Sequence, residues 1–265
     1  MADCGLTRTD CAVALGGGVV GDLTGFAAGC YMRGIKYVQM PTTLLASVDS
    51  SVGGKTAIDL TAGKNLAGLF YQPETVLCDV GFLDTLPEDV FACGLAEAVK
   101  TGVLSGHELF DRFFAANIKE NIAEIIALCV RYKGDVVQRD EFETGERKLL
   151  NLGHTIGHAI EKLSGYAVAH GQAVAMGMAM IARSAEALGD APKGMAELIA
   201  KALTANGLPT DCEYSAAELA RLALSDKKRS GSSMTLVIPA AVGGCTLKKL
   251  PVDELEQYIG AGYRK

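Results

Sequence analysis

The sequence predicts an α/β domain followed by an all-α domain, and two observations lead to this prediction. Up to about residue 86, short apolar segments alternate with helical segments and glycine turns. That alternation is typical of a parallel sheet with crossover helices. From Pro87 onward helical periodicity dominates. We therefore expect an α/β domain over residues 1–86 and a mainly helical domain over residues 87–265.

The first domain is predicted to contain a short sheet. The strand at 11–15 is expected to be buried and ends in three glycines, which favour a tight turn. Further strands are predicted at 37–40 and 75–79, with helices at 22–30 and 43–52. Doubly wound nucleotide-binding sheets usually have five or six strands. Three strands indicate either that other chains complete the sheet or that the sequence is a fragment.

The second domain is predicted to be almost free of strands. Pro87 suits a first helical turn, and the acidic residues after it favour the positive end of a helix. One strand is predicted at 234–239, and the long loop candidate is 139–153. Helices are expected at 88–105, 107–116, 119–139, 154–163, 170–188, 192–205, 215–225 and 252–260.

Composition limits the class of protein. Apolar residues make up 49% of the 265 residues and charged residues 21%, which supports a packed core rather than disorder. The net charge of −6 and the lack of a long basic tract argue against a nucleic-acid partner. No apolar stretch is long enough for a membrane span, and no targeting signal is evident, so we expect a cytoplasmic protein. The eight cysteines show no paired spacing and are expected to be small buried residues.

A glycine-rich turn, Gly16 to Asp22, lies between a predicted strand and a predicted helix. Glycine lets backbone amides approach a ligand, and the start of a helix attracts a diphosphate. The alternative is a tight turn without a ligand. The spacing differs from the usual dinucleotide fingerprint, so the turn alone does not identify a cofactor.

Three of the four histidines fall within a short segment. His154 and His158 lie four residues apart and would share one helix face, which suggests a zinc pair. No glutamate follows His154 at the position that a zincin needs. Glu97, in an apolar helical stretch, is the candidate carboxylate ligand, although it could instead pair with Lys100 three residues later.

Several cations stand beside small residues that leave room for a ligand. Each could bind phosphate, or could simply be a solvated surface residue. This set consists of Lys55, Lys64, Lys100, Lys133, Arg147, Lys227 and Lys228.

Eight segments in order resemble the 3-dehydroquinate synthase family, from about residue 5 to the C-terminus. The resemblance lies in residues 14–29, 31–35, 41–59, 63–73, 94–102, 147–159, 170–178 and 226–228. Members of this family have a longer N-terminal part, which would hold the opening strands. The resemblance thus implies a partial Rossmann-like nucleotide-binding domain followed by a helical domain that binds metal and substrate.

The resemblance also implies roles for individual residues. Glu97, His154 and His170 resemble ligands of Zn²⁺ or Co²⁺, whereas His158 resembles a contact on the substrate's phosphate side. Arg33 resembles an arginine that reaches the partner's site in a homodimer. Contacts to NAD are implied for Gly17, Gly18, Asp22, Thr42, Thr43, Asp49, Lys64 and Thr85. Substrate contacts are implied for Lys55, Asn65, Lys100, Lys133, Arg147 and Asn151, with one of Lys227 and Lys228.

The implied reaction converts 3-deoxy-D-arabino-heptulosonate 7-phosphate into 3-dehydroquinate and phosphate, a step of aromatic amino-acid biosynthesis. It proceeds by transient oxidation with NAD, phosphate elimination, reduction, ring opening and aldol closure. Three alternatives remain at this point. They are another sugar-phosphate cyclase, such as a deoxy-inosose or valiolone synthase, a metal-dependent polyol dehydrogenase, and a fragment without activity.

Overall fold

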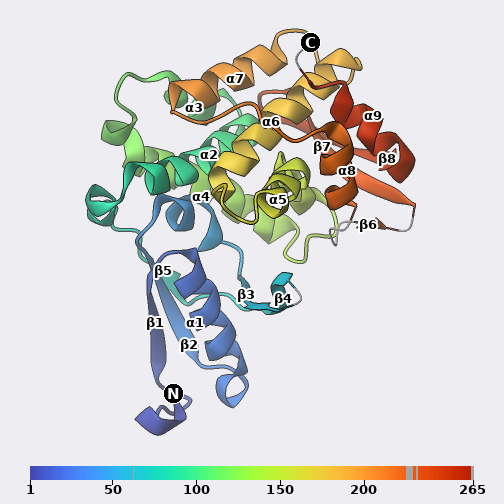
Figure 1. Cartoon of the computed structure of the whole chain (residues 1–265). Helices are drawn as coiled ribbons and strands as arrows, with labels where there is room; N and C mark the ends of the chain where they lie inside the picture. Colours follow the sequence, from blue (N-terminus) through green and yellow to red (C-terminus); the bar gives the residue numbers. More distant parts are fainter. Residues whose placement is uncertain (62, 225–228, 231, 264–265) are drawn as a thin grey trace. The chain divides into compact units, whose positions relative to one another are not determined.

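The computed structural model describes residues 1–61, 63–224, 229–230 and 232–263 (Figure 1). Its contacts divide the chain into two compact units. One comprises Met1–Gly94 and Ile122–Phe142, and the other Leu95–Asn121 and Glu143–Lys265. The domain boundary that the sequence predicts at residue 86 remains a prediction, since these units are defined by contacts alone. The contacts assign helix α4 (Ile122–Arg139) to the first unit, because it packs on the short π-helix η3 (Ala46–Ser50).

The first unit contains the predicted short parallel sheet. Its strands are β1 (Cys11–Gly16), β2 (Lys36–Pro41) and β5 (Thr75–Val76), in the order β1-β2-β5. The expectation that β1 is buried is wrong. Only Ala14 is buried, while Val13 and Leu15 are 57% and 55% exposed. Within the described residues, β1 is an edge strand that pairs with β2 alone, and the face carrying Val13 and Leu15 is largely uncovered.

Helix α1 (Gly18–Cys30) covers the other face of this sheet. Ala28 on the helix forms a small core with Ile35 and Tyr37. The Tyr37 ring stacks on Tyr71 with 5.7 Å between ring centroids. Their hydroxyls donate to backbone carbonyls, that of Tyr71 to Ile35 at 2.8 Å and that of Tyr37 to Tyr71 at 2.9 Å. This core therefore holds the C-terminal part of α1 against the sheet.

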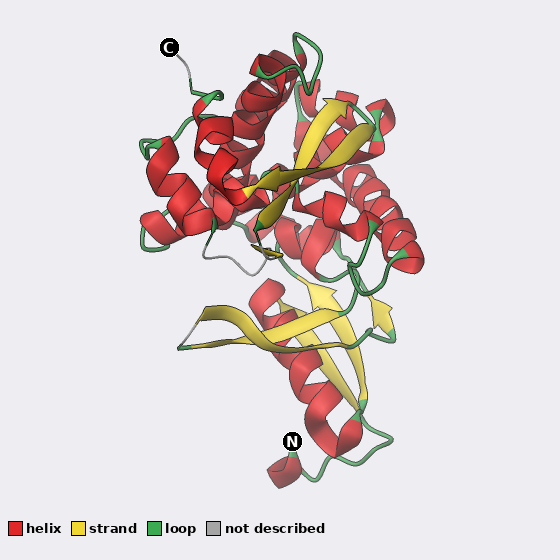
Figure 2. Cartoon of the chain, turned by 90° about the vertical axis from the view of Figure 1, so that its right-hand side faces the viewer, coloured by secondary structure: helices red, strands yellow, loops and turns green. Residues whose placement is uncertain are grey.

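An antiparallel hairpin in the first unit was not predicted. It joins β3 (Lys55–Leu60) to β4 (Gly63–Phe70) and is visible in Figure 2. Most of β4 is exposed, so its sequence lacks the alternation of buried and polar residues that indicates a strand. The helix expected at 43–52 is also shorter than predicted, with η3 as its π-helical part.

The second unit is mainly helical, as expected, and Figure 2 shows its helices in red. The sequence predicted a single strand here, at 234–239. The structure instead has a three-stranded sheet of β6 (Arg229–Ser230), β7 (Ser233–Ala241) and β8 (Gly244–Pro251), and β7 contains the predicted strand. The expected loop contains a 3₁₀-helix, η7 (Glu146–Asn151). Helix α2 (Glu88–Ser105) begins in the first unit and continues into the second. The other α-helices of the second unit are α3 (His107–Phe110), α5 (His154–Leu163), α6 (His170–Ala187), α7 (Met195–Ala205), α8 (Ala216–Ala223) and α9 (Leu255–Gly260).

The cysteine expectation is only partly correct. All eight cysteines are free, but only Cys129 is buried. Cys4, Cys11, Cys30 and Cys78 are exposed. Among the described residues, no helix combines the length and apolar composition required to cross a membrane.

Glycines allow α5 and α6 to approach closely. A Cβ on Gly177 of α6 would lie 2.1 Å from the carbonyl oxygen of Gly153 and 2.9 Å from the amide nitrogen of Gly157. Both neighbours are backbone atoms and cannot rotate away. The close approach fixes the two helices where their first residues, His154 and His170, begin.

We expect Gly177→Ala to destabilise the protein by about 1–3 kcal/mol or more, because the added methyl group would force the helices apart. Gly134→Ala is the control. Gly134 lies in α4, a Cβ there would meet nothing within 4 Å, and alanine should stabilise the helix by about 0.5–1 kcal/mol. Denaturant unfolding measures both changes. Equal stabilisation by the two substitutions would contradict the packing described.

Candidate active site

Three side chains of the second unit converge from three helices. Glu97 lies in the middle of α2 and is completely buried. His154 and His170 are the first residues of α5 and α6. One donor atom from each of the three residues lies within 4.8 Å of the others. Residues far apart in the sequence thus form one cluster of a carboxylate and two imidazoles.

The distances within this cluster match those of a metal site. Glu97 Oε1 lies 3.4 Å from His154 Nε2 and 3.3 Å from His170 Nε2. In a tetrahedral zinc site with bonds of about 2.0–2.1 Å, neighbouring ligand atoms are separated by about 3.3–3.4 Å. These two separations therefore suit an ion shared by Glu97 and the two histidines.

The Glu97 carboxylate needs positive charge. Its side chain contacts the Lys100 ammonium, so the pairing considered from the sequence is present beside the histidines. Neither carboxylate oxygen has a partner of good hydrogen-bond geometry among the described residues. Burial opposes ionisation, but Lys100 and His170 outweigh it and hold the pKa of Glu97 well below its usual range. A charged, buried carboxylate with incompletely satisfied oxygens is suited to a divalent cation.

His170 lies between two carboxylates. Burial disfavours the charged ring, but Glu161 and Glu97 outweigh burial and raise the pKa of His170 to about 10. At neutral pH the ring therefore carries a proton on each nitrogen. A metal ion bound at Nε2 would displace one of these protons. The residues present therefore fit a divalent ion in charge, donor type and spacing.

His158 lies beside the rings of His154 and His170 but is not one of the three donors that include Glu97. Its ring centroid is 5.4 Å from that of His154 and 6.1 Å from that of His170. The sequence left open a zinc pair of His154 and His158. The structure instead places His158 in a second set of donors, with Glu161 and His170.

Glu161 was not anticipated from the sequence. It is buried on α5 and lies 3.2 Å from His170 Nδ1. The spacing His154, His158, Glu161 follows i, i+4, i+7, so the three share a helix face. That spacing is a signal that could have identified the residue.

Other predicted substrate residues lie in the same unit. Arg147 is 2% exposed and Lys100 likewise 2%. The Asn151 amide donates to Glu143 Oε1 at 2.5 Å and to the Lys148 carbonyl at 3.2 Å. Burying a cation costs free energy, and for Lys100 the contact with the Glu97 carboxylate offsets that cost.

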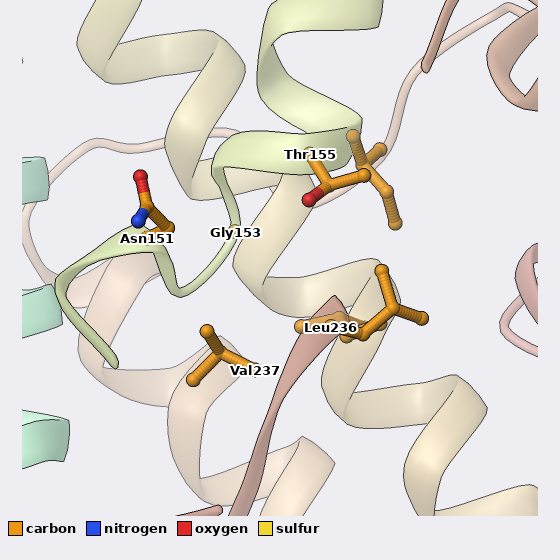
Figure 3. Close-up of a pocket in the computed structure, with 7 residues that line it drawn as sticks. Asn151, Gly153, Thr155, Leu236 and Val237 are labelled. Atoms are coloured by element: carbon orange, nitrogen blue, oxygen red, sulfur yellow. The ribbon is translucent and has the colours of Figure 1, made fainter. Parts of the chain in front are cut away.

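A small cavity adjoins Asn151. Figure 3 shows Asn151, Gly153 and Thr155 around it, with Leu236 and Val237 of β7 opposite. Its volume of about 10 Å³ is close to the space of one water molecule. The cavity is therefore too small for a sugar phosphate.

In the first unit, the glycine turn has the predicted strand–turn–helix context. Gly17 is the N-cap of α1, and no side chain caps the helix start there. A Cβ on Gly18 would approach Ser50 Oγ to 2.9 Å, so a side chain would crowd the turn. Thr42 donates its backbone N–H to Gly16, and the Thr43 hydroxyl accepts from the Ala46 amide. The uncapped amides suit an anion such as a diphosphate.

Two predicted cofactor residues, Asp22 and Asp49, interact with the predicted substrate residue Lys133 in this unit. The Lys133 ammonium contacts the Asp49 carboxylate and donates to the Asp49 carbonyl at 2.7 Å. Burial raises the pKa of Asp22 to about 6, although Lys133 opposes the shift and Asp59 adds to it. A strongly shifted aspartate beside an ion pair is typical of functional sites.

The remaining predicted residues of this unit are exposed. Lys55 begins β3, Lys64 and Asn65 lie in β4, and Arg33 follows α1 with a positive φ of 67°. The Asn65 amide donates to Asp59 Oδ1 at 2.8 Å. The exposed Thr85 donates its hydroxyl to the Phe82 carbonyl. Lys227 and Lys228 lie outside the described residues.

Comparisons with known proteins agree with one another. Two family models match, "3-dehydroquinate synthase N-terminal" over residues 1–93 and "3-dehydroquinate synthase C-terminal" over residues 94–229. The 3-dehydroquinate synthase of Clostridium perfringens is 48% identical over 249 residues, which cover 92% of this chain and 71% of that protein.

Solved structures of sugar-phosphate cyclases share the fold. A 2-deoxy-scyllo-inosose synthase complexed with carbaglucose-6-phosphate, NAD⁺ and Co²⁺ aligns with a TM-score of 0.89 and 27% identity, covering 99% of this chain and 77% of that one. The 2-epi-5-epi-valiolone synthase of Streptomyces hygroscopicus, with NAD⁺ and Zn²⁺ bound, gives 0.88 and 27%, covering 98% and 75%. Both family models and the 48% identity identify this chain as a member of the 3-dehydroquinate synthase family.

Proposed function

We propose that this chain performs the 3-dehydroquinate synthase reaction with NAD and one Zn²⁺ or Co²⁺ ion. The net reaction converts 3-deoxy-D-arabino-heptulosonate 7-phosphate into 3-dehydroquinate and inorganic phosphate. The observation that supports it most directly is the convergence of Glu97, His154 and His170 in a member of this family. The solved cyclases with NAD⁺ and a divalent metal support both cofactors.

Glu97, His154 and His170 would hold the metal ion. When bound, the ion supplies Lewis-acid polarisation of the substrate's oxygen atoms. The buried Glu97 brings negative charge to the ion, and the rings bring neutral nitrogen donors. Lys100 would then have a second role. Its ammonium group lies beside the Glu97 carboxylate and can donate a hydrogen bond that orients a substrate oxygen there.

The start of α1 would hold the diphosphate of NAD, with Gly17 and Gly18 allowing close approach. When bound, NAD supplies temporary removal and return of a hydride, so no net NADH forms. Asp22 is proposed to contact the nicotinamide side. Further cofactor contacts are proposed for Thr42, Thr43, Asp49, Lys64 and Thr85.

The cationic residues would bind the two charged ends of the substrate. Arg147 and Lys133 are proposed to pair with its carboxylate, and Asn151 to hydrogen bond nearby. The phosphate would be bound by Lys55, Asn65, His158 and a lysine of the 227–228 pair. Binding at both ends orients one flexible molecule through successive steps. Arg33 is proposed to reach the partner's site in a homodimer.

The activity is tested with the purified chain, NAD, Zn²⁺ and the heptulosonate phosphate. We expect phosphate release that equals substrate consumption, without lasting absorbance from NADH. Calorimetry with NAD checks cofactor binding separately. Lasting NADH formation with a polyol and no phosphate release would contradict the proposal and favour a polyol dehydrogenase, and absence of both activities would indicate an inactive fragment.

His154→Ala should abolish stoichiometric Zn²⁺ binding and turnover together, because only two of the three donors would remain. His107→Ala is the matched control, since His107 is exposed on α3 and pairs with the exposed Asp111. Metal analysis after gel filtration measures the content of both variants. Full zinc content in His154→Ala would refute its assignment as a ligand.

Asp22→Asn should stabilise the protein at pH 8. The folded-state pKa of about 6 lies above the ordinary value of 3.8, so ionisation of Asp22 opposes folding increasingly from pH 4 to pH 6 and fully above it. After allowance for partial solvation we expect a gain of about 1–2 kcal/mol at pH 8, and a smaller gain at pH 5. NAD affinity should fall in the same variant.

Urea unfolding at the two pH values and NAD calorimetry measure these effects. A gain that is larger at pH 5 than at pH 8 would contradict the shifted pKa. Unchanged NAD affinity would contradict the proposed contact without affecting the stability result.

A further inference from the structure

Glu161 is a buried carboxylate that none of the predicted site roles explains. Its side chain is 8% exposed and lies on α5, seven residues after His154. A carboxylate removed from water to this degree requires a partner. The described contact is with His170, whose Nδ1 lies 3.2 Å from Glu161 Oε2.

The two nitrogens of His170 face different carboxylates. Nδ1 faces Glu161, and Nε2 lies 3.3 Å from Glu97 Oε1. His154 has a parallel arrangement, since its Nδ1 lies 3.1 Å from the Leu152 carbonyl and its Nε2 lies 3.4 Å from the same Glu97 oxygen. Both rings therefore present Nε2 to Glu97 and are held from behind at Nδ1.

A neutral imidazole carries its proton on one nitrogen and a lone pair on the other. An acceptor at Nδ1 keeps the proton there and leaves the Nε2 lone pair for a metal. For His154 the acceptor is a neutral backbone carbonyl. For His170 it is a carboxylate, which also increases the basicity of the ring as a ligand.

We propose that Glu161 is a positioning residue that fixes the tautomer and ring orientation of His170 for metal binding at Nε2. This inference rests on the proposed metal centre. Glu161 acts through His170 and does not itself contact the ion.

A competing arrangement uses the second set of donors, His158, Glu161 and His170. An ion held there in addition to the first would take both nitrogens of His170 and require the ring to lose its last proton. A single ion held there instead would leave the buried Glu97 without the divalent charge that its oxygens suit. The first set with Glu161 behind it avoids both difficulties.

The experiment compares Co²⁺ binding by the full chain and two variants, Glu161→Ala and Glu161→Gln. Affinity is measured by competition with a chelator, and ligand geometry by the visible absorption of Co²⁺. Glu161→Ala should weaken binding about 10- to 100-fold and shift the Co²⁺ bands, because the ring would lose its support. Glu161→Gln keeps the shape and one acceptor oxygen, so it should recover most of the spectrum and part of the affinity.

Glu186→Ala is the control for a purely structural effect. Glu186 lies on α6 and accepts a hydrogen bond from the Ala196 amide at 3.0 Å, away from the donors. It should lower the stability of the metal-free protein while leaving Co²⁺ affinity and spectrum unchanged.

Unchanged Co²⁺ affinity and spectrum in Glu161→Ala, with normal binding by the unmodified chain, would overturn this inference alone. Two Co²⁺ ions per unmodified chain, with one lost in Glu161→Ala, would likewise overturn it and make Glu161 a ligand. Absence of Co²⁺ binding by the unmodified chain would overturn the proposed metal centre as well.

Discussion

The buried Glu97 carboxylate is the constraint on which the proposed site depends. It is fully enclosed, and positive charge around it is needed to keep it ionised. Lys100 supplies one charge from the same helix, and His154 and His170 approach from the starts of two others. Replacing a proton on His170 by a divalent ion satisfies the same carboxylate more completely, which links the stability of the second unit to metal binding.

The fold places these donors by close helix packing rather than by loops. Gly153, Gly157 and Gly177 bring the backbones of α5 and α6 together, so the two first-turn histidines are held by rigid elements. Rigid placement matters because a metal site tolerates little displacement of its ligands. In the first unit, burial of the proposed cofactor contact Asp22 raises its pKa, so its charged form at neutral pH lowers the stability of the folded chain.

Much of this arrangement could be predicted from the sequence, and the failures have physical reasons. Long helices were correctly expected because their apolar periodicity is strong. The grouping of His170 with Glu97 and His154 was expected from the family resemblance, and the structure brings the three together. The β3–β4 hairpin was missed because exposed strands leave little periodicity. The burial of β1 was wrong because an apolar run does not reveal whether a neighbouring strand or layer is present. Glu161 was missed because its partner is distant in sequence and its role depends on which ring nitrogen it faces.

The most direct test of the proposed metal site is X-ray absorption spectroscopy of the chain loaded with one equivalent of Zn²⁺. We predict an ion surrounded only by nitrogen and oxygen at about 2.0–2.2 Å, with the multiple-scattering signature of two imidazoles. A sulfur ligand near 2.3 Å, or a spectrum without imidazole scattering, would contradict the site formed by Glu97, His154 and His170.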